Sequence, residues 1–223
     1  MILLTATLAI ICLTPASANV LRKTIDNSIS GLDFGSNMPK EISATFPKVM
    51  DVTKKLTNLF LNGQTYMKLP AEVFSEAEHL EMINLSGGNL NEIESKAFYG
   101  ATKLKTLILE GNKLKSLPRE LFPQRNSMKE LDLSNNEIKS LSRTTFRNLG
   151  NLRKLNLSGN KITTLEGSVF ADMVQLQELD LSGNPIQSLS EEFFASLPHG
   201  LSLSFDDSTV DQQTLALSDK WAN

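Results

Sequence analysis

The chain has few of the residues that build catalytic or metal sites. Its 223 residues include one cysteine, two histidines and one tryptophan. The single thiol, Cys12, excludes a disulfide framework and a zinc site built on thiolates. No glycine-rich phosphate-binding loop is present. We therefore expect neither a cofactor nor a bound metal.

The chain also has no large excess of positive or negative charge. The formal net charge is −3, and Lys and Arg are scattered along the chain rather than clustered. Nucleic acids and anionic membranes both bind to basic faces. We therefore expect no nucleic-acid partner and no membrane-surface partner. The hydrophobic fraction of 40% and the charged fraction of 21% are ordinary for a globular protein, which excludes disorder throughout the chain.

Only one apolar run is long, and it lies at the N-terminus. Ile2–Leu13 is almost unbroken, and the small residues Ala16 and Ala18 follow it. A run of this length is too short to cross a membrane, which takes about 20 residues. An apolar run followed by small residues is typical of a secretory signal peptide, so we expect 1–18 to be removed before Asn19. The alternative is a buried N-terminal strand or helix. We expect a secreted, extracellular chain without membrane insertion.

The rest of the chain repeats one pattern with a period of 24 residues. One copy reads Leu104-x-x-Leu107-x-Leu109-x-x-Asn112, and further copies begin at Met128, Leu152 and Leu176. Weaker copies precede these, the first of them 27 residues long. The repeats are predicted at 29–55, 56–79, 80–103, 104–127, 128–151, 152–175 and 176–199, with an N-terminal cap segment at 19–28 and a degenerate final repeat and C-terminal cap at 200–223.

Two columns of residues recur with this period and have a structural explanation. The leucines at positions four and six of each repeat alternate, so they share one face of a short strand. The asparagine at position nine follows the strand, where its amide can satisfy loop backbone groups. A phenylalanine at position nineteen would fill the opposite side of each coil. The asparagines are Asn112, Asn136, Asn160 and Asn184, and the phenylalanines are Phe74, Phe98, Phe122, Phe146, Phe170 and Phe194.

These motifs resemble the leucine-rich repeat family in its 24-residue extracellular, or typical, subclass. Repeats of this kind occur in Toll-like receptor ectodomains, matrix proteoglycan cores and cell-adhesion proteins. The resemblance implies an α/β fold, a curved solenoid of about eight coils with a parallel β-sheet on its concave face. Stacking of neighbouring coils stabilises such a solenoid.

The chain departs from the family pattern at its ends. Extracellular relatives usually close both ends with cysteine-rich caps, and this chain has none. We expect Leu215, Leu217 and Trp221 to cover the C-terminal end. An uncovered end could instead stack against a second copy, which would give a homodimer.

The exposed strand positions of the concave face are the candidate binding site. We expect positions two, three, five, seven and eight of each repeat to face solvent there. The N-terminal half of this face carries large apolar side chains and the C-terminal half is charged, which is typical of a protein-binding surface. The alternative is that single exposed apolar residues are ordinary. The candidate partner-binding residues are Phe60, Met82, Ile108, Glu130, Asp132, Lys154 and Asp180.

Two N-glycosylation sequons fall on the same face. Asn84 and Asn156 each begin an Asn-Leu-Ser triplet at position five of a repeat. A glycan on Asn84 would stand between Phe60 and Ile108 and shield the apolar residues. In that case the interface would move to an edge of the sheet or to the convex side.

Taken together, these features predict a secreted, non-catalytic protein that binds a protein or glycan ligand. By resemblance, it would be an innate-immune recognition factor or a soluble receptor decoy. The alternative is a structural matrix or adhesion protein that acts by self-association or matrix binding. We do not expect an enzyme, because His79 and His199 fall five coils apart and cannot act together in one catalytic site. Asp132 and Asp180 fall about 10 Å apart, at the outer limit for paired glycosidase carboxylates.

Overall fold

The computed structural model describes residues 31–33, 57–63, 67–75 and 77–222. The predicted signal peptide, the N-terminal cap segment and most of the first repeat lie outside the described residues. The six later 24-residue repeats and the C-terminal segment are described almost completely.

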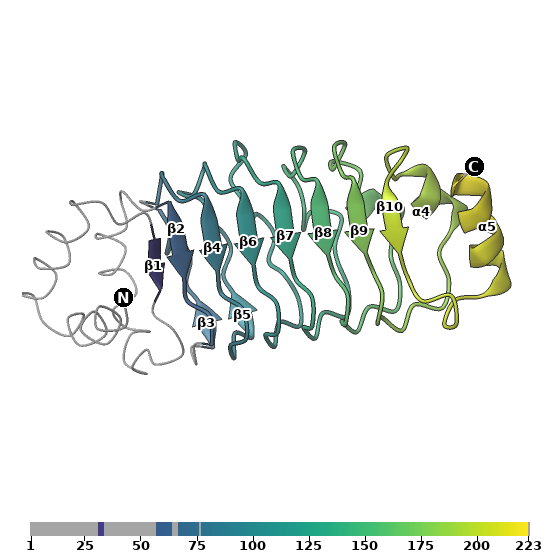
Figure 1. Cartoon of the computed structure of the whole chain (residues 1–223), viewed down its shortest axis with the longest axis horizontal. Coiled ribbons are helices and arrows are strands. Elements are labelled where there is room, and N and C mark those ends of the chain that lie inside the picture. Colours follow the sequence, from purple (N-terminus) through teal and green to yellow (C-terminus); the bar gives the residue numbers. More distant parts are fainter. Residues whose placement is uncertain (1–30, 34–56, 64–66, 76, 223) are drawn as a thin grey trace, which may run out of the picture.

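One parallel sheet of eight strands runs the length of the described chain (Figure 1). Each strand pairs with the strand of the next coil. Residues 24 positions apart are partners from β2 onward, as in the pair Leu107 and Leu131. The fold class predicted from the repeats, a leucine-rich repeat solenoid, is therefore confirmed. The strands are β1 (Gly31–Asp33), β2 (Asn58–Phe60), β4 (Met82–Asn84), β6 (Thr106–Ile108), β7 (Glu130–Asp132), β8 (Lys154–Asn156), β9 (Glu178–Asp180) and β10 (Ser202–Ser204).

The alternation of the strands determines what they bury. In β6 the central residue Leu107 is fully buried, whereas Thr106 and Ile108 on either side of it are half-buried. The central residues of β2, β4, β7, β8 and β9 are buried in the same way, whereas Leu203 at the centre of β10 is half-buried. A short second sheet, β3 (Lys68–Leu69) with β5 (Glu92–Ile93), lies beside the first coils.

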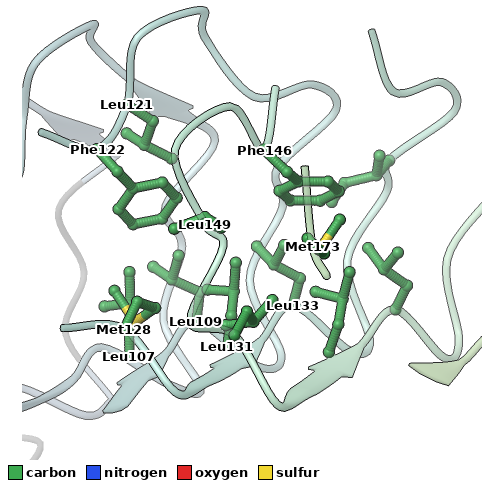
Figure 2. Packing of buried hydrophobic residues seen from close by; sticks show 14 of the residues in the cluster. Leu107, Leu109, Leu121, Phe122, Met128, Leu131, Leu133, Phe146, Leu149 and Met173 are labelled. Atoms are coloured by element: carbon green, nitrogen blue, oxygen red, sulfur yellow. The ribbon is translucent and has the colours of Figure 1, made fainter. Parts of the chain in front are cut away.

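Buried phenylalanines fill the side of the coils opposite the main sheet. Figure 2 shows Phe122 and Phe146 lying over the strand leucines, with Leu149 and Met173 between the two layers. The Phe74 and Phe98 rings stack with centroids 5.2 Å apart.

The last coil departs from the predicted phenylalanine column. The ring that packs on Phe170 belongs to Phe193, at 5.8 Å and nearly perpendicular, although the period points to Phe194. The reason is local structure, because this segment forms a helix, α4 (Glu191–Ala195), capped by the Ser190 hydroxyl. The helix turns Phe194 toward Trp221 instead, at 6.1 Å.

The predicted asparagine ladder is present and fully hydrogen-bonded. Asn160 Nδ2 donates to Leu133 O of the preceding coil at 3.0 Å and to Leu157 O of its own coil at 2.9 Å. Its Oδ1 accepts from the Ile138 backbone N–H at 3.0 Å. Asn112, Asn136 and Asn184 make the equivalent bonds.

A helix covers the C-terminal end of the solenoid. The helix α5 (Gln212–Ala222) follows β10, and the side chains of Leu217 and Trp221 pack against the core. Figure 1 shows α5 beside the last coil. Leu215 is half-buried but is not part of this packing. No helix among the described residues is both long and apolar enough to cross a membrane.

Candidate functional site

The residues at positions three and five of each coil form the face of the sheet that no other described segment covers, called here the concave face. The exposure of the candidate residues on it changes along the solenoid. Phe60, Met82 and Ile108, in the N-terminal half, are half-buried. Glu130 and Lys154, in the C-terminal half, are exposed. The apolar side chains of this face are therefore reachable from solvent only in part.

The three apolar candidates lie on neighbouring strands. Phe60 is the register partner of Asn84, and Asn84 is the partner of Ile108. Met82 is on the same strand as Asn84, two positions earlier. The side chain of Asn84 therefore stands between two apolar groups.

A depression of about 410 Å³ hollows the concave face from β6 to β10. Five of the seven candidate residues line it: Ile108, Glu130, Asp132, Lys154 and Asp180. Phe60 and Met82 lie outside it, toward the N-terminal end. The structure thus joins one apolar candidate with all four charged ones in a single hollow.

Local hydrogen bonds hold the carboxylates of the depression in place. Asp132 Oδ1 accepts from the Ser134 backbone N–H at 2.9 Å and from the Ser134 hydroxyl at 2.6 Å. Asp180 makes the same two bonds with Ser182, at 3.0 and 2.6 Å. The second carboxylate oxygen of each aspartate makes no hydrogen bond within the described chain.

These bonds correct one prediction. Position seven was expected to face solvent, but Ser134 is only 3% exposed, and Ser158 and Ser182 are half-buried. Their hydroxyls turn back to the side chain two residues earlier, so they support the concave face rather than offer contacts to a ligand.

Lys154 forms the one ion pair of the depression. Its Nζ lies 2.9 Å from a carboxylate oxygen of Glu178 on the next strand. The hydrogen bond with Glu178 raises the pKa of Lys154, and the charges of Glu178 and Glu130 act in the same direction. Four carboxylates and one ammonium group line the depression, so its field is negative.

The two sequon asparagines share the geometry of the aspartates. Asn84 Oδ1 accepts from the Ser86 backbone N–H at 2.9 Å. Asn156 Oδ1 accepts from both the backbone and the hydroxyl of Ser158. The Nδ2 atom, to which a glycan would be attached, makes no hydrogen bond in either residue within the described chain. Glycosylation itself stays a prediction.

The structure also places the histidines and the aspartate pair that the sequence singled out. No group of three or more His, Cys, Asp or Glu side chains among the described residues could hold a metal ion. His79 and His199 are both exposed. Asp132 and Asp180 are two strands apart, with Asn156 on the strand between them.

One row of basic residues was not predicted from the sequence. Lys105, Lys129 and Arg153 occupy position two of three successive coils, and consecutive backbones in this row are hydrogen-bonded at 2.8 Å. The basic residues are scattered only along the sequence, because a spacing of 24 places them side by side in space. The signal was available in the repeat alignment.

Comparison with protein families gives a match over most of the chain. The family model described as leucine rich repeat matches residues 54–114, 102–162, 126–186 and 150–207. No curated protein matches the sequence.

Solved structures with the same architecture include receptors and a bacterial protein. In the Toll–Spatzle complex from Drosophila, the matched chain is 25% identical with a TM-score of 0.68, covering 85% of this chain and 25% of that one. In the TLR13–ssRNA13 complex the identity is 23% and the TM-score 0.68, covering 84% and 26%. The Leptospira interrogans leucine-rich repeat protein LIC12759 is 28% identical with a TM-score of 0.63, covering 79% and 42%. This chain therefore spans about a quarter of the length of the Toll and TLR13 chains.

Proposed function

The chain belongs to the leucine-rich repeat family, and we propose that it is a non-catalytic module that recognises a macromolecular partner through its concave face. The depression from β6 to β10 carries this proposal. It combines the partly exposed Ile108 with the anchored carboxylates of Asp132 and Asp180. An apolar group beside polar groups of fixed geometry is what a specific protein interface requires.

The hydrogen bonds that hold Asp132 and Asp180 support a role in binding a partner, and not only contact with water. An ordinary surface aspartate loses rotamer freedom when it binds a ligand. Asp132 and Asp180 have already lost it, because two hydrogen bonds hold one oxygen of each. The other oxygen is free to accept a donor from a partner. Binding here therefore costs less conformational entropy than binding at a mobile carboxylate.

A protein or glycan is the partner that fits this face. TLR13 is found in a complex with single-stranded RNA and Toll in a complex with Spatzle. In this chain the depression is lined by four carboxylates and one ammonium group, and a negative field repels a phosphate backbone. We therefore expect no nucleic acid on the concave face.

The proposal also includes where the protein acts and in which process. We propose that the chain is secreted and acts as an innate-immune recognition factor or as a soluble decoy for a receptor ligand. The predicted signal peptide and the likeness to the Toll ectodomain support this. We also propose glycans on Asn84 and Asn156. The Asn156 side chain lines the depression, so a glycan there would occupy part of it.

The alternative, a matrix or adhesion protein that stacks end to end, finds less support. The helix α5 covers the C-terminal end with Leu217 and Trp221, so stacking at that end would require the helix to move. Sedimentation at rising protein concentration tests this point. A mass that doubles at micromolar concentration would favour the alternative.

Affinity capture from the native extracellular fluid tests the main proposal. One bait is the wild-type chain, produced with glycosylation, and a second carries Phe60→Asp and Ile108→Asp. The matched control carries Met67→Asp and Val174→Asp, two apolar side chains that are 60% and 70% exposed and lie off the concave face. Circular dichroism and urea midpoints show whether all three baits are folded.

We expect a partner that the wild type and the control retain and the concave-face variant loses. Retention of the same partner by all three baits would place the interface elsewhere. Loss from both double variants would show that added charge, and not the concave face, abolishes binding.

A further inference from the structure

The net charge of −3 hides a strong separation of charge along the solenoid. Residues 103–161 contain thirteen Lys and Arg but only five Asp and Glu. Residues 172–223 contain nine Asp and Glu but only one Lys. The middle coils are therefore strongly positive and the C-terminal coils strongly negative. A field of this kind attracts charged partners at long range.

Part of the positive charge lies along one side of the sheet, at the N-terminal ends of successive strands. The Lys129 backbone N–H donates to Lys105 O at 2.8 Å, and the Arg153 N–H donates to Lys129 O at 2.8 Å. These bonds join neighbouring strands, which lie about 4.8 Å apart. Lys105, Lys129 and Arg153 thus form a row across three consecutive strands. Lys103 precedes the same strand as Lys105. These four residues are called here the basic edge.

Several cations of the basic edge lie close to the carboxylate of Glu81. Lys105 Nζ lies 2.7 Å from Glu81, at the N-terminal end of the row. The hydrogen bond from Lys105 lowers the pKa of Glu81, and the charges of Lys103 and Lys129 lower it further. Three cations of the basic edge therefore act on the same carboxyl group.

Most of the basic edge has no ion-pair partner in the part of the chain that the structure describes. Lys103, Lys129 and Arg153 are exposed and form no ion pair among the described residues. Two more exposed cations, Arg125 and Arg147, precede β7 and β8 on the incoming turns. Unpaired cations held side by side repel one another, and a bound anion removes that repulsion.

We propose that the basic edge binds a linear sulfated polysaccharide. The row follows three neighbouring strands at a regular backbone spacing, so it fits a ligand with regularly spaced anions. The basic edge borders the depression, since Lys129 and Arg153 directly precede Glu130 and Lys154 in its lining, and in this proposal the two surfaces take different ligands. A sulfated chain anchored in the surroundings would then hold the protein in place while the concave face meets its partner.

Single-stranded nucleic acid fits the basic edge less well. Proteins that bind single strands combine cations with aromatic side chains on which the bases stack. The basic edge consists of three lysines and one arginine and contains no aromatic side chain, and its neighbours at the two ends of the row are Glu81 and Gln177. A sulfated polysaccharide has no bases and needs no stacking platform.

Binding of the full chain to immobilised heparin, used as the sulfated probe, tests the proposal. The dissociation constant is measured at several NaCl concentrations for the wild type and for the variant Lys129→Gln, Arg153→Gln. The matched control, Lys113→Gln, Lys115→Gln, removes the same charge from two exposed lysines beyond the other end of β6. Desulfated heparin and a single-stranded poly(U) RNA serve as further probes.

We expect the wild type to bind heparin and to lose affinity for the desulfated form. The basic-edge variant should bind roughly tenfold more weakly or worse near physiological salt, and its slope of log affinity against log salt should fall by about two. The control should change affinity less than threefold.

Several results would overturn the proposal. Equal weakening in both variants would mean that net charge alone attracts heparin. Absence of heparin binding would remove the ligand class. Tighter binding to RNA than to heparin, lost in the basic-edge variant, would make the edge a nucleic-acid site. The variant Phe60→Ala, Ile108→Ala, which leaves the charge unchanged, should bind heparin normally, so this proposal and the concave-face proposal can fail independently.

Discussion

Replacing Asn160 with alanine tests how the coils are held together. Among the described residues, the Ile138 backbone N–H donates only to the Asn160 side chain, so the alanine variant leaves a buried donor unpaired. Leu133 O and Leu157 O each lose one of two bonds, because Asn136 and Asn184 still donate to them. An orphaned buried amide costs about 1–3 kcal/mol, and each weakened carbonyl adds a fraction of that. We expect the free energy of unfolding to fall by about 3 kcal/mol.

Urea unfolding followed by circular dichroism measures this change. The matched control is Asn151→Ala, since Asn151 is exposed and makes one long bond of 3.3 Å to Asn126 O. The control should change stability by less than about 0.5 kcal/mol. The variant Asn160→Asp keeps an acceptor but places negative charge against carbonyl oxygens, so it should be at least as damaging as alanine. A loss below about 1 kcal/mol for Asn160→Ala would refute the ladder's stabilising role.

Two further predictions concern packing and the C-terminal cap. Gly100→Ala should destabilise the chain by about 3 kcal/mol or more, since a methyl group there would overlap the backbone oxygen of Ser75 in the preceding coil. Urea unfolding checks this, and a neutral result would contradict the close packing of the coils. Asp211 accepts from the Thr214 backbone N–H at 2.8 Å at the start of α5, and hydrogen bonds with Thr214 lower the pKa of Asp211 below its ordinary value of 3.8. The cap should therefore stabilise α5 fully above that pH and fail as the pH falls through the lower folded value. Fluorescence of Trp221, the only tryptophan, should report the loss, and Asp211→Asn should remove this pH dependence.

The repeat period made much of the fold predictable from the sequence. Asn112 and Asn184 sit where the 24-residue spacing places them, because each coil must satisfy the same backbone groups in the same way. Phe193 could not be predicted in the same manner. Successive side chains of a helix differ in direction by about 100°, so in α4 Phe193 packs on Phe170, and Phe194, which is also buried, packs on Trp221.

The site was less predictable, for two physical reasons. Ser134 was expected to be exposed, but a serine two residues after an aspartate can bond back to it, and the strand pattern alone does not show that competition. Lys105, Lys129 and Arg153 look scattered in a linear reading of charge. Only the combination of the period with the strand register brings them together.

Oxidative footprinting with the purified partner tests the central claim most directly. Met82 lies on the concave face and is half-buried, whereas Met67 is 60% exposed and lies off that face. The two methionines therefore report two surfaces of the same molecule in one measurement. We predict that the partner slows oxidation of Met82 and leaves Met67 unchanged. Protection of Met67 with Met82 unchanged would contradict recognition through the concave face.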